Sequence, residues 1–211
     1  MKYLLPVLLL LLGCAEGSSA ETDTPAPQDP TDAGLPATVT DTMFVEGTAQ
    51  PVTLRRYDAP GIPFTTALPD GDFRPAVLDG TGGQEVRFIA AFGQAEQPDA
   101  YVAFLFPAVE GAGALHRAVQ DTLAARGWQP TEHDDPERTA PCPWADGYHT
   151  YRDEGEVLST GYACLGEHGG QPFALITHVP VPYSEGFGPR LALLLEHFRW
   201  RDTGAPLAGR S

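Results

Sequence analysis

Residues 85–106 read EVRFIAAFGQAEQPDAYVAFLF and contain the two clearest strand patterns of the chain. In Glu85–Phe92, the residues that share a face with Val86 are all apolar, which is typical of a strand with one buried face. Tyr101–Phe106 is apolar on both faces, which favours a central position in a sheet. The polar segment Gly93–Asp99 suits a hairpin loop, so the stretch predicts an antiparallel pair of strands.

Shorter strand candidates lie on both sides of this pair. Those before it are separated by Pro-Gly and Asp-Gly turns, and those after it by acidic, glycine-containing turns. The candidates are Phe44–Val45, Val52–Tyr57, Phe64–Leu68, Arg74–Leu78, Gly147–Asp153, Val157–Leu165 and Pro172–Val179.

Two segments have the periodicity of a helix. Glu110–Gly127 repeats apolar residues at helical spacing, and its last glycine suits a left-handed C-cap with Trp128 packed in the core behind it. The second helix is expected from about Glu185 or Pro189 to Arg199. Its apolar residues share one face: Phe187, Leu191, Leu194, Leu195 and Phe198.

The order of strands, helix, strands and helix predicts a single α+β domain, an antiparallel β-sheet covered by two helices. This element order, together with the phrase PFTTALPD at residues 63–70, resembles the PsbP-like fold. That fold is an αβα sandwich of exported and lipid-anchored bacterial and photosynthetic proteins. The resemblance includes no motif of specific residues and therefore assigns no functional residue.

The N-terminus reads LLPVLLLLLGC from Leu4 to Cys14, after a single basic residue, which is the layout of a secretory signal. Its end, Leu11-Leu12-Gly13-Cys14, resembles the lipobox of bacterial lipoproteins. The resemblance implies cleavage before Cys14 and attachment of lipid to its sulfur. An ordinary secreted protein cut elsewhere, for instance after Ala20, is the alternative. A membrane-spanning helix needs about 20 apolar residues, and this run is shorter and contains Pro6.

These features predict a signal peptide over residues 1–13 and a lipidated cysteine followed by a disordered tether over 14–42. The tether is small, polar, acidic and rich in proline, a composition that buries too little apolar surface to fold. The globular domain is expected over 43–202 and a C-terminal tail over 203–211. Because Ala15 rather than an aspartate follows the cysteine, the resemblance implies the outer membrane in a Gram-negative host. In any other host it implies the outer face of the cytoplasmic membrane.

The formal charge is −15, and Lys2 is the only lysine of the 211 residues. Codon bias and adaptation to salt both explain this composition. In either case no basic patch is available to neutralise phosphates, so we expect no nucleic-acid partner. The expected contact with the membrane is the lipid on Cys14.

Two cysteines remain after the lipidated one. Cys142 lies in Gln129–Trp144, which its prolines keep irregular, and Cys164 lies in a predicted strand. An even remainder in an exported chain predicts a disulfide, with a stabilisation of roughly 3 kcal/mol. Two free buried thiols are the alternative.

Residues of the kind that bind zinc occur in two groups. Cys142, His149, Cys164 and His168 form the first group, and His133, Asp134 and Asp135 form the second. An extended chain separates Cys164 from His168 by about 13 Å, too far for one zinc ion. The second group has the composition of a solvated acidic loop. We therefore predict no metal and no cofactor. The other histidines, His116, His178 and His197, occupy ordinary strand or helix positions.

The sequence contains no Gly-x-Ser-x-Gly nucleophile elbow. A Ser-x-x-Lys motif is also absent, because the mature chain has no lysine. The best candidate for a binding surface is a group of aromatic residues with polar tips: Trp144, Tyr148, Tyr151 and Tyr162. Packing within the sheet is the other interpretation of these side chains. The leading hypothesis is a non-catalytic binding or accessory domain, for an envelope protein or a small ligand, anchored by lipid at the envelope. The rival is an envelope hydrolase or metal-dependent enzyme with a site near Cys142.

Overall fold

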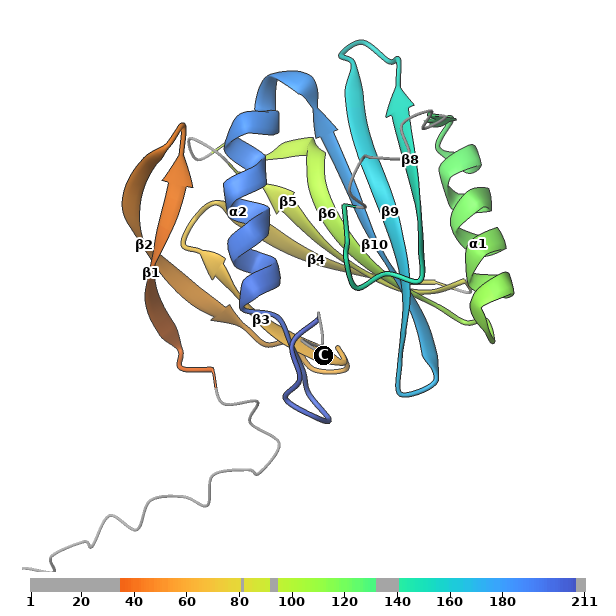
Figure 1. The fold of residues 1–211 in the computed structure, drawn as a ribbon, viewed down its shortest axis with the longest axis horizontal. Coiled ribbons are helices and arrows are strands. Elements are labelled where there is room, and N and C mark those ends of the chain that lie inside the picture. Colours follow the sequence, from red (N-terminus) through yellow and green to blue (C-terminus); the bar gives the residue numbers. More distant parts are fainter. Residues whose placement is uncertain (1–34, 81, 92–94, 132–140, 208–211) are drawn as a thin grey trace, which may run out of the picture. The chain divides into compact units, whose positions relative to one another are not determined.

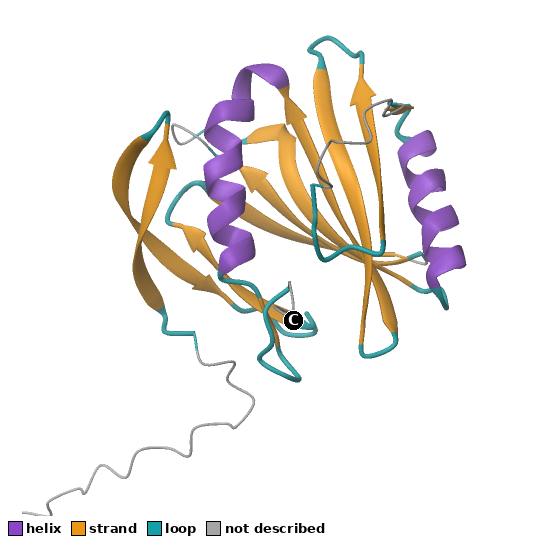
Figure 2. Cartoon of the chain, in the orientation of Figure 1, coloured by secondary structure: helices purple, strands orange, loops and turns teal. Residues whose placement is uncertain are grey.

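The computed structural model describes residues 35–80, 82–91, 95–131 and 141–207. These residues belong to one compact unit and form two antiparallel sheets and two α-helices, with more residues in strands than in helices (Figure 2). Neither of these helices is long and apolar enough to cross a membrane. The predicted signal peptide, Cys14 and most of the predicted tether lie outside the described residues.

Within this part of the chain, the larger sheet has seven strands in the order β4-β5-β6-β10-β9-β8-β7 (Figure 1). The central position predicted for Tyr101–Phe106 is confirmed, because β6 lies between β5 and β10. The strands are β4 (Phe73–Gly80), β5 (Gly83–Ala90), β6 (Gln97–Pro107), β7 (Gln129–Pro130), β8 (Gly147–Asp153), β9 (Ser159–His168) and β10 (Gln171–Pro180).

A second, four-stranded sheet corrects the prediction of one sheet covered by two helices. Its order is β1-β2-β3-β11, and the short β11 returns from the end of the chain to pair Trp200 with Phe64. β3 is buried at every position, since it contacts the core on both of its faces. The strands are β1 (Thr38–Val45), β2 (Thr48–Tyr57), β3 (Phe64–Pro69) and β11 (Arg199–Trp200).

The two helices pack on opposite faces of the larger sheet. α1 (Ala112–Ala125) presents Leu115, Val119 and Leu123 to one face, where Trp128 is also buried as predicted. α2 (Ser184–Glu196) covers the other face with the predicted apolar residues and also contacts the smaller sheet through Leu193. α2 therefore packs against the larger sheet and the smaller sheet at once. A single-turn 3-10 helix, η2 (Val181–Tyr183), precedes α2.

Both ends of the folded domain extend beyond the limits expected from the sequence. β1 begins at Thr38, inside the predicted tether, and Asp41 in that strand lies 2.8 Å from Nε2 of His197. At the other end, residues 203–207 of the predicted tail fold back on the domain, because Trp200 N–H donates to the Ala205 carbonyl and Leu207 is buried in the core. Few apolar residues mark either segment, so composition alone assigned them to the tails.

Candidate functional site

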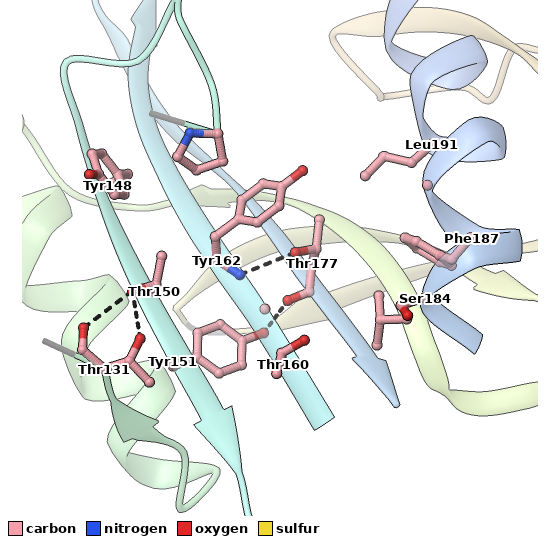
Figure 3. Close-up of a pocket in the computed structure, with 14 residues that line it drawn as sticks. Thr131, Tyr148, Thr150, Tyr151, Thr160, Tyr162, Thr177, Ser184, Phe187 and Leu191 are labelled. Atoms are coloured by element: carbon pink, nitrogen blue, oxygen red, sulfur yellow. Dashed lines mark hydrogen bonds between the residues drawn. The ribbon is translucent and has the colours of Figure 1, made fainter. Parts of the chain in front are cut away.

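A cleft of about 640 Å³ separates the β8–β10 part of the larger sheet from α2 (Figure 3). It lies on the sheet face that α2 covers. Side chains at alternate strand positions form the sheet wall: Tyr148, Thr150, Thr160, Tyr162, Thr177 and Val179. The helix wall consists of Ser184, Phe187, Gly188 and Leu191.

The two walls differ in chemistry. Hydroxyl groups dominate the sheet wall, where the Thr131 and Thr150 hydroxyls lie 2.6 Å apart and Tyr162 N–H donates to Thr177 Oγ1 at 3.2 Å (Figure 3). The helix wall is mostly apolar, with Phe187 and Leu191 facing the tyrosines. Every described residue that lines the cleft is hydroxylic, apolar or glycine. Burial raises the pKa of the Tyr162 phenol, which therefore stays protonated and can donate a hydrogen bond.

The predicted aromatic surface is divided by the fold. Tyr148 and Tyr162 line the cleft on the α2 side of the sheet, while Tyr151 packs mainly on the opposite side. Its ring stacks on Trp128 at 4.4 Å, and its hydroxyl donates to the Thr177 carbonyl beside the cleft. Trp144 is not a lining residue among those described, because it stacks on Phe173 at 5.4 Å.

The sequence analysis missed the threonines and the helix wall. Thr150 occupies the strand position two residues after Tyr148, and Thr160 the position two residues before Tyr162. Strand alternation therefore contained the signal for both. Phe187 and Leu191 were predicted as core residues, and no local pattern shows that a core residue also borders a cleft.

The predicted cysteine pair is present at disulfide distance. Cys142 and Cys164 are joined with their Cα atoms 6.2 Å apart, and both are buried in the core on the α2 side of the larger sheet. The bridge fixes the segment that carries Pro141, another lining residue, next to β9. Because the thiolate is the nucleophile and the metal ligand, the disulfide also leaves neither cysteine able to attack a substrate or bind a metal.

The remaining zinc-type residues are dispersed. The His149 ring packs against His116 at 4.4 Å, and burial lowers the pKa of His149. His168 stacks on Trp200 at 4.0 Å and contacts the Asp202 carboxylate. Across the described ranges, no group of three or more potential ligands is placed to hold a metal ion. The second predicted group, His133, Asp134 and Asp135, lies outside those ranges.

Serine, histidine and aspartate do meet at one end of the larger sheet. His178 Nε2 lies 3.8 Å from Asp153 Oδ2, and Ser159 follows on the neighbouring strand. The Ser159 hydroxyl, however, donates to the Val157 carbonyl at 3.3 Å and is itself buried. A nucleophilic serine requires a hydrogen bond to its base, so this arrangement is not that of a hydrolase triad.

Comparison with known proteins adds a structural similarity. No protein-family model matches the chain, and no curated protein matches its sequence. Among solved structures, the chain is similar to the solution structure of cyanobacterial PsbP (CyanoP) from Synechocystis sp. PCC 6803. That comparison has 11% sequence identity and a TM-score of 0.41, and it covers 70% of this chain and 92% of the other. The similarity is to a PsbP-like structure, the resemblance expected from the element order.

Proposed function

We propose that this protein is a lipid-anchored envelope protein whose folded domain binds a ligand, without catalysis, in the cleft between β8–β10 and α2. The observation that carries the proposal is the pairing of a hydroxyl-rich wall with an apolar wall around about 640 Å³. Clefts of this size that combine apolar side chains with a few hydrogen-bonding groups are typical of small-molecule sites.

The chemistry of the two walls favours an uncharged ligand. Hydroxyls of threonine and tyrosine supply hydrogen bonds but no counter-charge for an ionic group, whose desolvation would be costly. The strongly acidic composition of the chain further disfavours an anion. The ligand's apolar side would contact Phe187 and Leu191, and its polar side would face Thr150, Thr160 and Tyr162.

We also propose that the domain is a variant of the PsbP-like sandwich. Its support is the layering of α1, the larger sheet and α2, in the element order that suggested this fold. The smaller sheet beside α2 is then an addition to, or an elaboration of, that arrangement.

The binding proposal is tested by filling the cleft from its helix wall. Gly188 lines the cleft, and a Cβ added there meets no heavy atom within 4 Å. We expect Gly188→Leu to weaken ligands of the cleft at least tenfold, which is about 1.4 kcal/mol. The fold should persist, since the helix propensity of leucine, better than that of glycine by up to about 1 kcal/mol, counters the clash that Pro189 imposes on a helical residue before it.

The measurement is a ligand-observed NMR screen of uncharged, hydroxyl-bearing fragments, followed by affinity measurements on the variants. The matched control is Gly113→Leu in α1, where an added Cβ lies at ordinary contact distance, 3.9 Å, from the Arg117 side chain. Fragments that bind the wild type and the control alike but lose affinity for Gly188→Leu support the proposal. Fragments whose affinity neither substitution changes would show that the cleft is not the binding site.

The anchoring proposal rests on the sequence around Cys14. Cys14→Ser lacks the sulfur that receives the lipid. The variant should therefore incorporate no labelled fatty acid and should move from the membrane fraction to the soluble fraction. Detergent phase partitioning of the two proteins, expressed in a bacterium, measures this change. A Cys14→Ser variant that stays in the membrane fraction would contradict the lipoprotein hypothesis. The control is Ala15→Asp, which retains the cysteine and should still be lipidated.

A further inference from the structure

A second cleft, of about 460 Å³, lies at one end of the larger sheet. The ends of four adjacent strands meet there: the start of β6, the end of β10, the start of β9 and the end of β8. Residues from each strand end line it, among them Asp99, His178, Ser159 and Asp153. This site lies outside the ligand cleft, and neither the proposed ligand nor the lipid anchor uses it.

Acidic side chains dominate the charge of this second cleft. Asp99, Asp153 and Glu156 line it together with His178, and we call these four residues the acidic corner. Asp99 and Glu156 form no ion pair with any residue that the structure describes. The lining contains no arginine, so the three carboxylates create a negative potential at the mouth of the cleft.

The arginines around the acidic corner are already engaged. Arg152, next to Asp153 in the chain, pairs with Glu154 at 3.1 Å. Arg87 and Arg126 both pair with Glu85, at 2.6 and 3.1 Å, and lie against the rings of Tyr101 and Trp128. They therefore do not neutralise the acidic corner from within its lining. A positively charged group from another molecule is the natural counterpart of these carboxylates.

His178 provides an independent sign of a missing partner. Its side chain is 5% exposed, it stacks on Trp128 at 4.3 Å, and its Nδ1 is buried with no hydrogen-bond partner among the described residues. The other ring nitrogen, Nε2, lies 3.8 Å from Asp153 Oδ2, beyond hydrogen-bond distance, so it is the nitrogen that a hydrogen-bonding group bound in the acidic corner can approach. Burial lowers the pKa of His178, so the imidazole is neutral near pH 7 and does not repel a cation.

An exposed apolar patch adjoins the acidic corner. Val157, Leu158, Val181 and Tyr183 are 51%, 48%, 46% and 37% exposed, and Val181 N–H donates to the Leu158 carbonyl at 2.9 Å. Val157 and Tyr183 also line the second cleft, so the patch and the carboxylates form one surface. Clustered exposed apolar residues with a polar rim are typical of protein-binding sites. The Tyr183 ring can in addition face a cation.

We propose that this surface docks a protein segment in which an arginine or lysine is flanked by apolar residues. The basic side chain enters the acidic corner, and the flanking apolar residues cover the patch. Charge complementarity excludes an anionic membrane surface, because three carboxylates would face its phosphates. A free polyamine would satisfy the carboxylates but would leave Leu158 and Val181 exposed.

Two synthetic peptides separate these contributions in the full-length protein, held in a neutral detergent. One is acetyl-Leu-Arg-Leu-amide, and the other replaces its arginine with the uncharged isostere citrulline. The arginine peptide should shift the amide resonances of Asp153, Leu158 and Val181, and it should bind about tenfold more tightly than the citrulline peptide. Raising the salt concentration should reduce this difference.

Variants assign the effect to the two parts of the surface. Asp153→Asn retains the acceptor that holds Gly155 N–H and should weaken the arginine peptide about tenfold, with Glu156→Gln as a second, exposed substitution. Leu158→Ser should weaken both peptides alike. Glu167→Gln, near the other end of β9, is the matched control and should change neither affinity.

Equal binding of the two peptides, or full binding to Asp153→Asn and Glu156→Gln, would overturn the proposal. Spermidine that binds as tightly as the arginine peptide, with no dependence on Leu158, would assign the corner to a polyamine instead. Binding to anionic phospholipid vesicles that Asp153→Asn strengthens would likewise overturn it in favour of a membrane contact.

Discussion

Gly161→Ala is expected to lower the free energy of unfolding by about 3 kcal/mol or more, the upper range for overpacking a core. Gly161 lies in β9, with β8 on one side and β10 on the other. A Cβ at this position would overlap the Thr177 carbonyl oxygen and would lie 2.5 Å from the Tyr151 hydroxyl. Because one of these atoms is backbone in a central strand, no side-chain rotation relieves the overlap.

The consequence extends to both faces of the sheet. The Tyr151 hydroxyl crosses over Gly161 to reach the Thr177 carbonyl, and its ring stacks on Trp128 on the α1 side. An alanine would displace this tyrosine from its hydrogen bond and from its stacking partner together. Gly161 and Thr177 also line the ligand cleft, so a partly folded variant should bind cleft ligands weakly.

Urea unfolding followed by tryptophan fluorescence measures this loss. Gly80→Ala at the end of β4 is the matched control, because an added Cβ there meets nothing within 4 Å. The control should unfold at nearly the urea concentration of the wild type. A Gly161→Ala protein as stable as the control would mean that the Tyr151 hydroxyl does not lie over this glycine.

Local patterns predicted the part of the fold that is built from neighbouring segments. The hairpin of β5 and β6 follows from the alternation beginning at Val86 and the apolar run from Tyr101. The pairing of β8 with β9 follows in the same way from the acidic turn between them. In each case the two strands are close in sequence, so the turn determines the pairing.

Long-range pairings escaped prediction for a physical reason. β3 pairs with β11, which lies near the other end of the chain. β11 has only two residues, too few to show the alternation that predicts a strand. The apolar character of Phe64–Pro69 indicates burial but not the identity of the layers that bury it. The second sheet therefore emerges only when α2 returns the chain to β3.

The same distinction applies to the two clefts. Tyr148 and Tyr162 were predicted from their residue type, and alternation would have added Thr150 and Thr160. The acidic corner has no such signature, because its residues come from the ends of β6, β8 and β10 and a turn. Carboxylates in turns are typical of solvated loops, and only the packing of four strand ends brings these together.

Reduction of the Cys142–Cys164 disulfide is expected to lower the free energy of unfolding by about 3 kcal/mol, which corresponds to a fall of roughly 10 °C in the melting temperature. The bridge spans 22 residues, so opening it restores substantial entropy to the unfolded chain. Both cysteines are buried in the core on the α2 side of the larger sheet, and without the bond the loop would no longer be fixed to the sheet there.

The segment around Cys142 depends strongly on this bond. Pro141 and Pro143 flank the cysteine and cannot donate backbone hydrogen bonds. The sheet therefore holds the segment through the bond to Cys164, the stacking of Trp144 on Phe173 of β10, and the hydrogen bond from Asp146 N–H to the Leu165 carbonyl. Since Pro141 lines the ligand cleft, reduction should also weaken cleft ligands while leaving the acidic corner unchanged. The disulfide would thus connect the proposed export of the protein to the shape of the proposed binding site.

Differential scanning calorimetry with and without reductant measures the stability change, and thiol titration of the unfolded, delipidated protein counts the free cysteines. The double variant Cys142→Ser/Cys164→Ser is the control, because its melting temperature should already be low and should not respond to reductant. Protein from an oxidising compartment should release no thiol until it is reduced. Two titratable thiols in such material would contradict the bridge and would make Cys142 available again as a reactive residue beside the cleft.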